Sequence, residues 1–249
     1  MSLLELDRVT VRYGGVTAVD SVGFAVRPGS LTGLIGPNGA GKTTLIDAIT
    51  GMVRCTGDIR LDGQSVGSWP AHRRSRAGIV RTFQSLELFQ ELTVRENLEA
   101  YAPSRTDRSA SHGVEYALDR LDVGWAADRY PSELSHGSAR LVSVARALAA
   151  GPRLLLLDEP AAGLDAGESR TLGAKLRALV DEGLTTILLV DHDMDLIMNV
   201  CDDIHVLDFG RRIASGPAAT VREDPEVARA YLGTQATEVG ADRGTGGAA

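Results

Sequence analysis

The chain has 249 residues, 43% of them hydrophobic, and a net charge of −7 at pH 7. This length is sufficient for a sizeable core, either one large domain or a domain with a subdomain. The acidic balance argues against a general nucleic-acid surface. No apolar run approaches the ~20 residues that cross a bilayer, and the first residues lack the pattern of a signal peptide. We therefore expect a globular cytoplasmic protein without a nucleic-acid partner.

Cysteines and clustered basic residues are two further compositional features. Cys55 and Cys201 lie far apart without metal-ligand spacing, so buried free thiols in a reducing compartment are expected. The basic run at 72–76 predicts a solvated helix face.

Alternating apolar and polar residues dominate the first thirty positions, as in Leu4, Leu6, Val9 and Val11. This period of two predicts half-buried antiparallel strands, and 57–63 predicts another short strand between turns. An antiparallel β region is therefore expected on both sides of the next motif.

A phosphate-binding loop follows at 36–43, which fits the pattern G-x-x-x-x-G-K-[ST] between an apolar strand at 31–35 and a helix from Lys42 to Ile49. Lys42 is one of only two lysines among 26 basic residues, which indicates a need for a compact ammonium there. We expect Lys42 to reach the β- and γ-phosphates of a nucleoside triphosphate and the Thr43 hydroxyl to bind Mg²⁺. The predicted nucleotide-binding residues are Gly36, Pro37, Asn38, Gly39, Ala40, Gly41, Lys42, Thr43 and Thr44.

The middle third has a helical pattern. Thr93 and Glu96 form a capping-box pattern, and the spacing at 114–121 and 139–150 predicts helices. Apolar strands at 154–157, 185–190 and 204–207 then alternate with helices, one of them near 169–182. This alternation is typical of a doubly wound parallel sheet, so we predict an α/β core interrupted by a helical insertion.

An acidic pair ends the strand at 154–157. Parallel strands present ligands at their carboxyl ends. We expect Asp158 to hold Mg²⁺ and Glu159 to act as the general base that polarises the attacking water.

Further motifs resemble those of ABC ATPases. The segment from Leu134 to Ser138 stands where that family has its LSGGQ signature, although His136 and Ser138 depart from it. The other matches are Tyr13 as the A-loop aromatic residue, Gln84 as the Q-loop, 162–165 ending in Asp165 as the D-loop, and His192 as the H-loop. The resemblance covers residues 1 to about 233.

The resemblance implies the family's fold: a P-loop NTPase core with a mixed or parallel sheet, an antiparallel β subdomain and an inserted α-helical subdomain. It divides one domain, 1–233, into a core at 1–84 and 152–233 and a helical subdomain at about 85–151. The remainder, 234–249, is expected to be a disordered tail.

The resemblance also implies a head-to-tail dimer, either of two copies or with a related ATPase. Each ATP would lie between Lys42, Thr43 and Asp158 of one chain and the signature of the other. The signature contacts would come from Ser135 and Gly137. The roles implied for the other motif residues are adenine stacking by Tyr13, a D-loop contact to nucleotide by Asp165, orientation of water and Glu159 by His192, and sensing of Mg²⁺ and water by Gln84.

Finer resemblance, in the segments 81–98, 191–198 and 224–233, points to the ATPases of branched-chain amino acid importers, a pattern shared with urea and amide importers. It implies ATP hydrolysis coupled to transport, with transmembrane permease subunits and, indirectly, a solute-binding protein as partners. The chain would be peripheral at the cytoplasmic face of the membrane. The alternatives are an ABC ATPase outside transport and a stand-alone P-loop kinase or GTPase.

Overall fold

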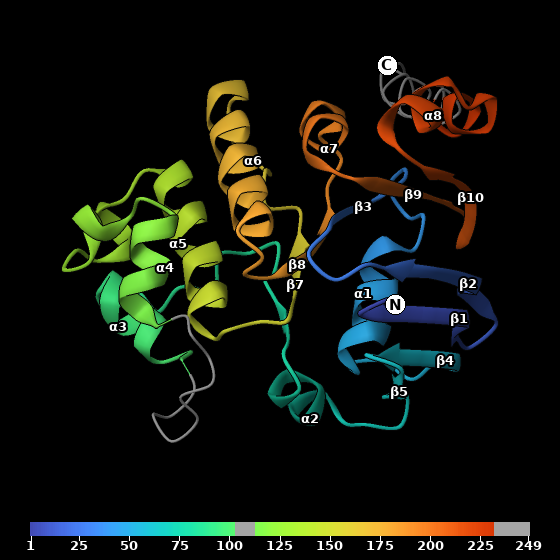
Figure 1. Ribbon diagram of the computed structural model, residues 1–249, viewed down its shortest axis with the longest axis horizontal. Helices are drawn as coiled ribbons and strands as arrows, with labels where there is room; N and C mark the ends of the chain where they lie inside the picture. The colour runs from blue at the N-terminus through green and yellow to red at the C-terminus, as the bar shows by residue number, and fades with distance from the viewer. Residues whose placement is uncertain (103–112, 232–249) are drawn as a thin grey trace, which may run out of the picture.

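The computed structural model of the protein describes residues 1–102 and 113–231, and the predicted tail lies outside them. Two sheets lie side by side on one side of the molecule (Figure 1). The first is antiparallel with the strand order β2-β1-β4-β5. Its strands are β1 (Leu4–Tyr13), β2 (Val16–Val26), β4 (Thr56–Leu61) and β5 (Gln64–Ser65).

The second sheet has six strands in the order β10-β9-β3-β8-β7-β6. All neighbours in it are parallel except β9 and β10, which makes the sheet mixed, as predicted. Its strands are β3 (Leu31–Ile35), β6 (Ile79–Arg81), β7 (Leu154–Asp158), β8 (Thr186–Val190), β9 (Asp203–Asp208) and β10 (Arg211–Gly216).

Both faces of the mixed sheet are covered, which explains the continuous apolar run of β7. Leu154 and Leu156 pack with α1 (Lys42–Thr50) and the antiparallel sheet, whereas Leu155 and Leu157 pack with the helices of the opposite face. Those helices include α6 (Ala166–Asp181) and α7 (Met194–Val200), while α8 (Ala218–Glu223) packs near β9 and β10. A parallel strand buried on both sides needs no polar alternation.

Between β6 and β7 the chain leaves the sheet and forms a group of helices, which lie at the left of Figure 1, opposite the antiparallel sheet. They are α3 (Val94–Glu99), α4 (Val114–Arg120) and α5 (His136–Ala149), with 3₁₀ turns at Gly124–Ala126 and Pro131–Glu133. The predicted capping box starts α3, because the Thr93 amide donates to Glu96 Oε2 at 2.8 Å and the Glu96 amide to Thr93 Oγ1 at 3.3 Å. No helix of the described ranges is long and apolar enough to span a bilayer.

Helix boundaries and thiols differ in detail from the predictions. α5 begins at His136 and α6 at Ala166, earlier than predicted, since Ser135 and Asp165 cap them. Cys55 and Cys201 are free thiols, as expected, but are half-buried and not fully buried. Side-chain hydroxyls and carboxylates at helix N-caps thus set boundaries that apolar spacing alone misses.

The basic run is the helix α2 (Ala71–Arg76), and the prediction of a solvated face was wrong for Arg74. Arg74 is 2% exposed, and its Nη1 donates to the carbonyls of Ala48 at 2.6 Å and Ile49 at 2.8 Å. Its other nitrogens donate to the carbonyls of Gly67 and Trp69. A cation at the carboxyl end of α1 satisfies carbonyls that the helix leaves unpaired, so Arg74 fixes the helix that follows the phosphate loop.

Replacing Arg74 with Met leaves these carbonyls without their donor. We expect Arg74→Met to lower the free energy of unfolding by about 2–4 kcal/mol, measured by urea denaturation. The control is Arg73→Met on the same helix, where the guanidinium lies over the Trp69 ring 3.9 Å from its centroid. That variant is expected to lose less than about 1 kcal/mol. Equal losses in the two variants would contradict the structural role of Arg74.

Candidate active site

The phosphate loop between β3 and α1 depends on two glycines that pack against backbone. Gly36 has a φ of 151°, and a Cβ there would lie 2.2 Å from the carbonyl oxygen of Leu207. Gly41 has a φ of 100°, and a Cβ there would lie 2.5 Å from the carbonyl oxygen of Ala18. No side chain fits at either position, so the loop backbone is free to face a ligand at the N-terminus of α1.

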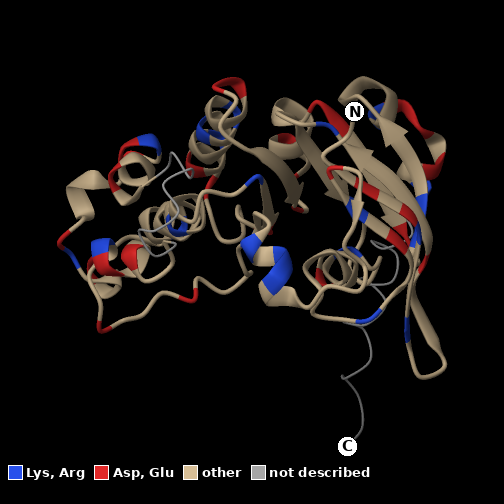
Figure 2. Cartoon of the chain, turned by 60° about the horizontal axis from the view of Figure 1, so that its bottom comes forward, with Lys and Arg blue, Asp and Glu red and all other residues tan. Residues whose placement is uncertain are grey.

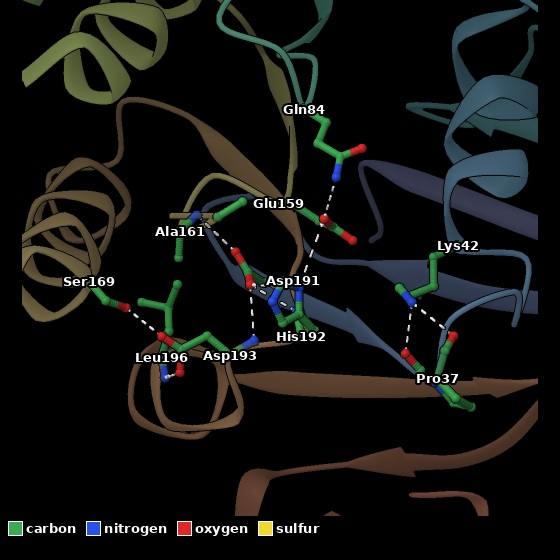
Figure 3. Close-up of polar contacts among 12 residues, drawn as sticks. Pro37, Lys42, Gln84, Glu159, Ala161, Ser169, Asp191, His192, Asp193 and Leu196 are labelled. Carbon is green, nitrogen blue, oxygen red and sulfur yellow. Dashed lines mark hydrogen bonds and ion pairs between the residues drawn. The ribbon is translucent and has the colours of Figure 1, made fainter. Parts of the chain in front are cut away.

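Lys42 is the first residue of α1, and its ammonium lies inside the curve of the loop (Figure 3). Only 6% of the residue is exposed, and Nζ donates to the carbonyls of Gly36 at 2.7 Å and Pro37 at 3.1 Å. Burial lowers the pKa of the Lys42 ammonium, and the charges of Glu159 and Asp158 act in the opposite direction. A cation and helix amides at one place fit the phosphates of a nucleotide.

Around the same loop, Asn38, Gly39 and Thr43 are exposed, whereas Pro37 and Thr44 are half-buried and Ala40 is buried. The Thr43 hydroxyl is thus accessible next to Lys42.

Asp158 ends β7 and is 4% exposed. Its Oδ2 accepts a hydrogen bond from Arg81 Nη2 at 2.7 Å, and the same guanidinium pairs with Asp47 of α1. Arg81 therefore ties the helix of the phosphate loop to the acidic end of β7. Sequence reasoning gave Arg81 no role, because its partners are distant in the chain.

Glu159 brings three predicted residues together. Its carboxylate Oε2 accepts a hydrogen bond from Gln84 Nε2 at 2.9 Å and lies 3.9 Å from His192 Nδ1 (Figure 3). Its backbone has a φ of 49°, an uncommon value for a residue with a side chain, and its amide donates to the Val190 carbonyl at 2.7 Å. A strained turn thus directs Glu159 between the ends of β6 and β8.

Asp191, to which the sequence analysis gave no role, supports the segments that carry Glu159 and His192. It is fully buried, and its carboxylate accepts hydrogen bonds from the amides of Ala161 at 3.0 Å, His192 at 2.8 Å and Asp193 at 3.0 Å. The residue joins the turn after Glu159 to the segment that carries His192. An acid directly after a buried strand was the signal that identified Asp158, and the same signal was present at Asp191.

The signature residues lie apart from the phosphate loop. Ser135 caps α5, accepting from the Ser138 amide at 3.2 Å, and a Cβ on Gly137 would lie 2.3 Å from Glu168 Oε1. His136 Nε2 lies 3.2 Å from the carbonyl oxygen of Ala162. Among the described residues, no hydrogen bond or ion pair joins Ser135 or Gly137 to residues 36–43. The signature of one chain therefore packs on its own 162–168 segment.

Asp165 and Tyr13 are both exposed. The Asp165 carboxylate caps α6 and accepts from the amides of Glu168 at 2.8 Å and Gly167 at 2.7 Å, which lower the pKa of this carboxyl. Tyr13 ends β1 and is 51% exposed. The structure thus shows a capping role for Asp165 and an accessible ring for Tyr13.

Comparisons with known proteins give one consistent result. The family model of ABC transporters matches residues 19–162, and that of branched-chain amino acid ATP-binding cassette transporters matches 211–237. The chain is 38% identical to the high-affinity branched-chain amino acid transport ATP-binding proteins BraF of Pseudomonas aeruginosa and LivG of Escherichia coli K12. Each alignment covers 93% of this chain and 98% of the relative.

Among solved structures, the chain superposes on the ADP conformation of MJ1267, an ATP-binding cassette of an ABC transporter, with a TM-score of 0.84 and 30% identity. That match covers 94% of this chain and 99% of the other. A nucleotide-free ATP-binding cassette from an ABC transporter gives a TM-score of 0.83 at 29% identity, covering 93% and 99% of the two chains. These matches remove the alternative of a stand-alone kinase or GTPase. The protein belongs to the ABC transporter family and is an ATP-binding cassette that hydrolyses ATP.

Proposed function

We propose that the protein powers a membrane importer for branched-chain amino acids or related amides. The observation that carries this proposal is the similarity, over nearly the whole chain, to BraF and LivG, whose names specify branched-chain amino acid transport. The second family match at 211–237 supports the same subfamily. Transmembrane permeases would bind the chain at the cytoplasmic face of the membrane, and a solute-binding protein would deliver the solute to them.

The separation of the signature from the phosphate loop supports a head-to-tail dimer. Within the described ranges the Ser135 hydroxyl hydrogen-bonds to Ser138, and no hydrogen bond joins Ser135 to residues 36–43. A nucleotide held by Lys42 and Thr43 would therefore need a signature from elsewhere to complete its site. A second ATPase, identical or related, would bring its own Ser135 and Gly137 to that phosphate. The exposed Asp165 would lie at this interface.

Hydrolysis in this arrangement relies on the groups around Glu159. Oxygen ligands such as the Thr43 hydroxyl and the Asp158 carboxylate fit Mg²⁺, which binds few protein oxygens and completes its shell with phosphates and water. When bound, Mg²⁺ would neutralise phosphate charge. Glu159 would accept the proton of the attacking water, and Gln84 and His192 would orient that water. Tyr13 would stack on the adenine ring.

The only two lysines offer a matched test of nucleotide binding. Lys42→Ala removes the ammonium from the loop, and we expect ATP affinity to fall at least about 30-fold in a fluorescence titration, equivalent to about 2 kcal/mol. Lys175, which lies on α6 and pairs with Asp122, is the control. The Lys175→Ala affinity should stay within about twofold of wild type. Similar losses in both variants would contradict the role of Lys42.

Glu159→Gln keeps the shape of the side chain but cannot accept a proton. We expect kcat for ATP to fall about 100-fold or more while ATP binding is retained, and an ATP-bound dimer to elute in size-exclusion chromatography. Glu182→Gln, at the end of α6, is the control. Unchanged turnover would remove Glu159 from the base role. A variant that binds ATP yet remains monomeric would exclude the homodimer and require a related second ATPase.

We also propose that the helical segment at about 85–151 moves relative to the core at 1–84 and 152–233, and that the permease docks between them. A hollow lined by Met52, His72, Phe83 and Tyr101 lies there, next to α2. Met52 is 55% exposed, and α2 carries three arginines, Arg73, Arg74 and Arg76, of which Arg74 is buried; arginines are blue in Figure 2. Met52, Phe83 and Tyr101 line one hollow together, and an apolar patch with basic residues at its rim is typical of an interaction site.

Site-directed cross-linking tests this docking surface. In a background without Cys55 and Cys201, Met52→Cys should cross-link to a permease subunit in membranes that contain the whole importer. The control is Val16→Cys, which is 67% exposed at the start of β2. Cross-linking at position 16 but not at 52 would place the permease elsewhere.

A further inference from the structure

Arg140 on the first turns of α5 links two motif segments through their backbones. The residue is 5% exposed, and its Nη1 donates to the carbonyl of Gln84 at 2.9 Å while its Nη2 donates to the carbonyl of Ala162 at 3.1 Å. Neither acceptor lies in α5, so the guanidinium joins the signature helix to the loop after β6 and to the turn after β7.

Both acceptors flank Glu159. The Gln84 side chain donates to Glu159 Oε2 at 2.9 Å, and the Ala162 amide donates to the Glu159 carbonyl at 3.2 Å. Arg140 therefore fixes the backbone of Gln84, whose side chain contacts the Glu159 carboxylate. It also fixes the turn from Glu159 to Ala162. One planar group with divergent donors sets the distance between the two segments.

The burial of this charge is costly, which makes its placement informative. Within the described ranges Arg140 forms no ion pair, and its buried Nε has no hydrogen-bond partner. Burial lowers the pKa of the Arg140 guanidinium, and the nearby charges of Asp191 and Glu159 act in the opposite direction without pairing directly with it. An apolar side chain at this place would avoid the cost of burying a cation. The hydrogen bonds to the Gln84 and Ala162 carbonyls replace part of the hydration that the buried guanidinium loses.

His136 reinforces the same connection. Its Nε2 lies 3.2 Å from the Ala162 carbonyl that Arg140 also contacts, and a Cβ on Gly163 would come within 2.8 Å of that Nε2. The departure of His136 from the family pattern thus adds a second contact between the signature and the turn after Glu159. Movement of the start of α5 therefore acts directly on this turn.

We propose that Arg140 is a positioning residue that holds the side-chain amide of Gln84 against the Glu159 carboxylate and connects this contact to the signature helix α5. The inference rests on the proposed roles of Gln84 and Glu159 in hydrolysis. Arg140 acts through Gln84, so its effect on turnover depends on the presence of the Gln84 side chain.

A double-mutant cycle on the purified full chain tests this dependence. We expect Arg140→Met to lower kcat about tenfold while KM for ATP changes less than about twofold, since the nucleotide contacts remain. In a Gln84→Ala background, the same substitution should lower kcat by less than about twofold. Arg140→Lys, which reaches one carbonyl, should recover part of the activity. Losses that multiply in the double variant would overturn the proposal.

Arg74→Met is the matched control, because Arg74 is also a buried arginine that donates to backbone carbonyls, and its acceptors on α1 lie at the end of that helix opposite the phosphate loop. It should lower stability without lowering kcat. Equal kcat losses in Arg74→Met and Arg140→Met would assign the effect to general destabilisation and overturn the proposal. If Gln84→Ala leaves kcat unchanged, the proposed role of Gln84 fails and the inference fails with it. If Gln84→Ala lowers kcat but Arg140→Met does not, only the inference about Arg140 is overturned.

Hydrogen exchange gives a readout that does not need turnover. In Arg140→Met, amides of the 83–88 segment should exchange at least about threefold faster than in wild type, and those in Arg74→Met should not. Unchanged exchange in that segment would show that Arg140 does not restrain it, which would overturn the proposal.

Discussion

The active site depends on one constraint: strands β3, β7 and β8 are buried on both faces, so charged side chains are confined to their carboxyl ends and the loops that follow. The phosphate loop, Asp158 with Glu159, and Asp191 follow the ends of these neighbouring strands. The sheet therefore brings the Lys42 cation close to the carboxylates of Asp158 and Glu159, which are far from it in the chain and for which we propose roles in Mg²⁺ binding and proton transfer. Helices on both faces exclude water from the strands and leave this edge open.

Buried charges then connect the elements at this edge. Arg81 forms ion pairs with Asp47 of α1 and Asp158 of β7. The Asp191 carboxylate accepts hydrogen bonds from backbone amides of two loops. A buried ion that is hydrogen-bonded on several sides resists displacement, because losing one partner leaves a charge without compensation. These contacts hold the phosphate loop and Glu159 in a fixed relation, while the exposed Gln84 and His192 reach Glu159 from the segments that follow β6 and β8.

The signature belongs to the same network although it lies away from the phosphate loop. Its helix α5 contacts the segments on both sides of Glu159 through Arg140, and His136 contacts one of them. A signature that binds the nucleotide of a second subunit would thus be mechanically connected to the hydrolytic centre of its own subunit. This connection offers a physical route by which closure at one site affects the other.

By itself the sequence determined the α/β class, the phosphate loop with Lys42, the acidic pair at 158–159 and the helical insertion. These features depend on short spacings and on periodicity, which local propensity and backbone geometry control. The tertiary structure decided the roles of Arg74, Arg81, Arg140 and Asp191. In the sequence the three arginines resemble solvated charges on polar faces, because their partners are brought near only when the sheet and its helices pack. Asp191 follows a buried strand as Asp158 does, but the amides that it accepts from are fixed only by the fold. Burial of an arginine depends on carbonyls from distant segments, and no local pattern encodes that proximity.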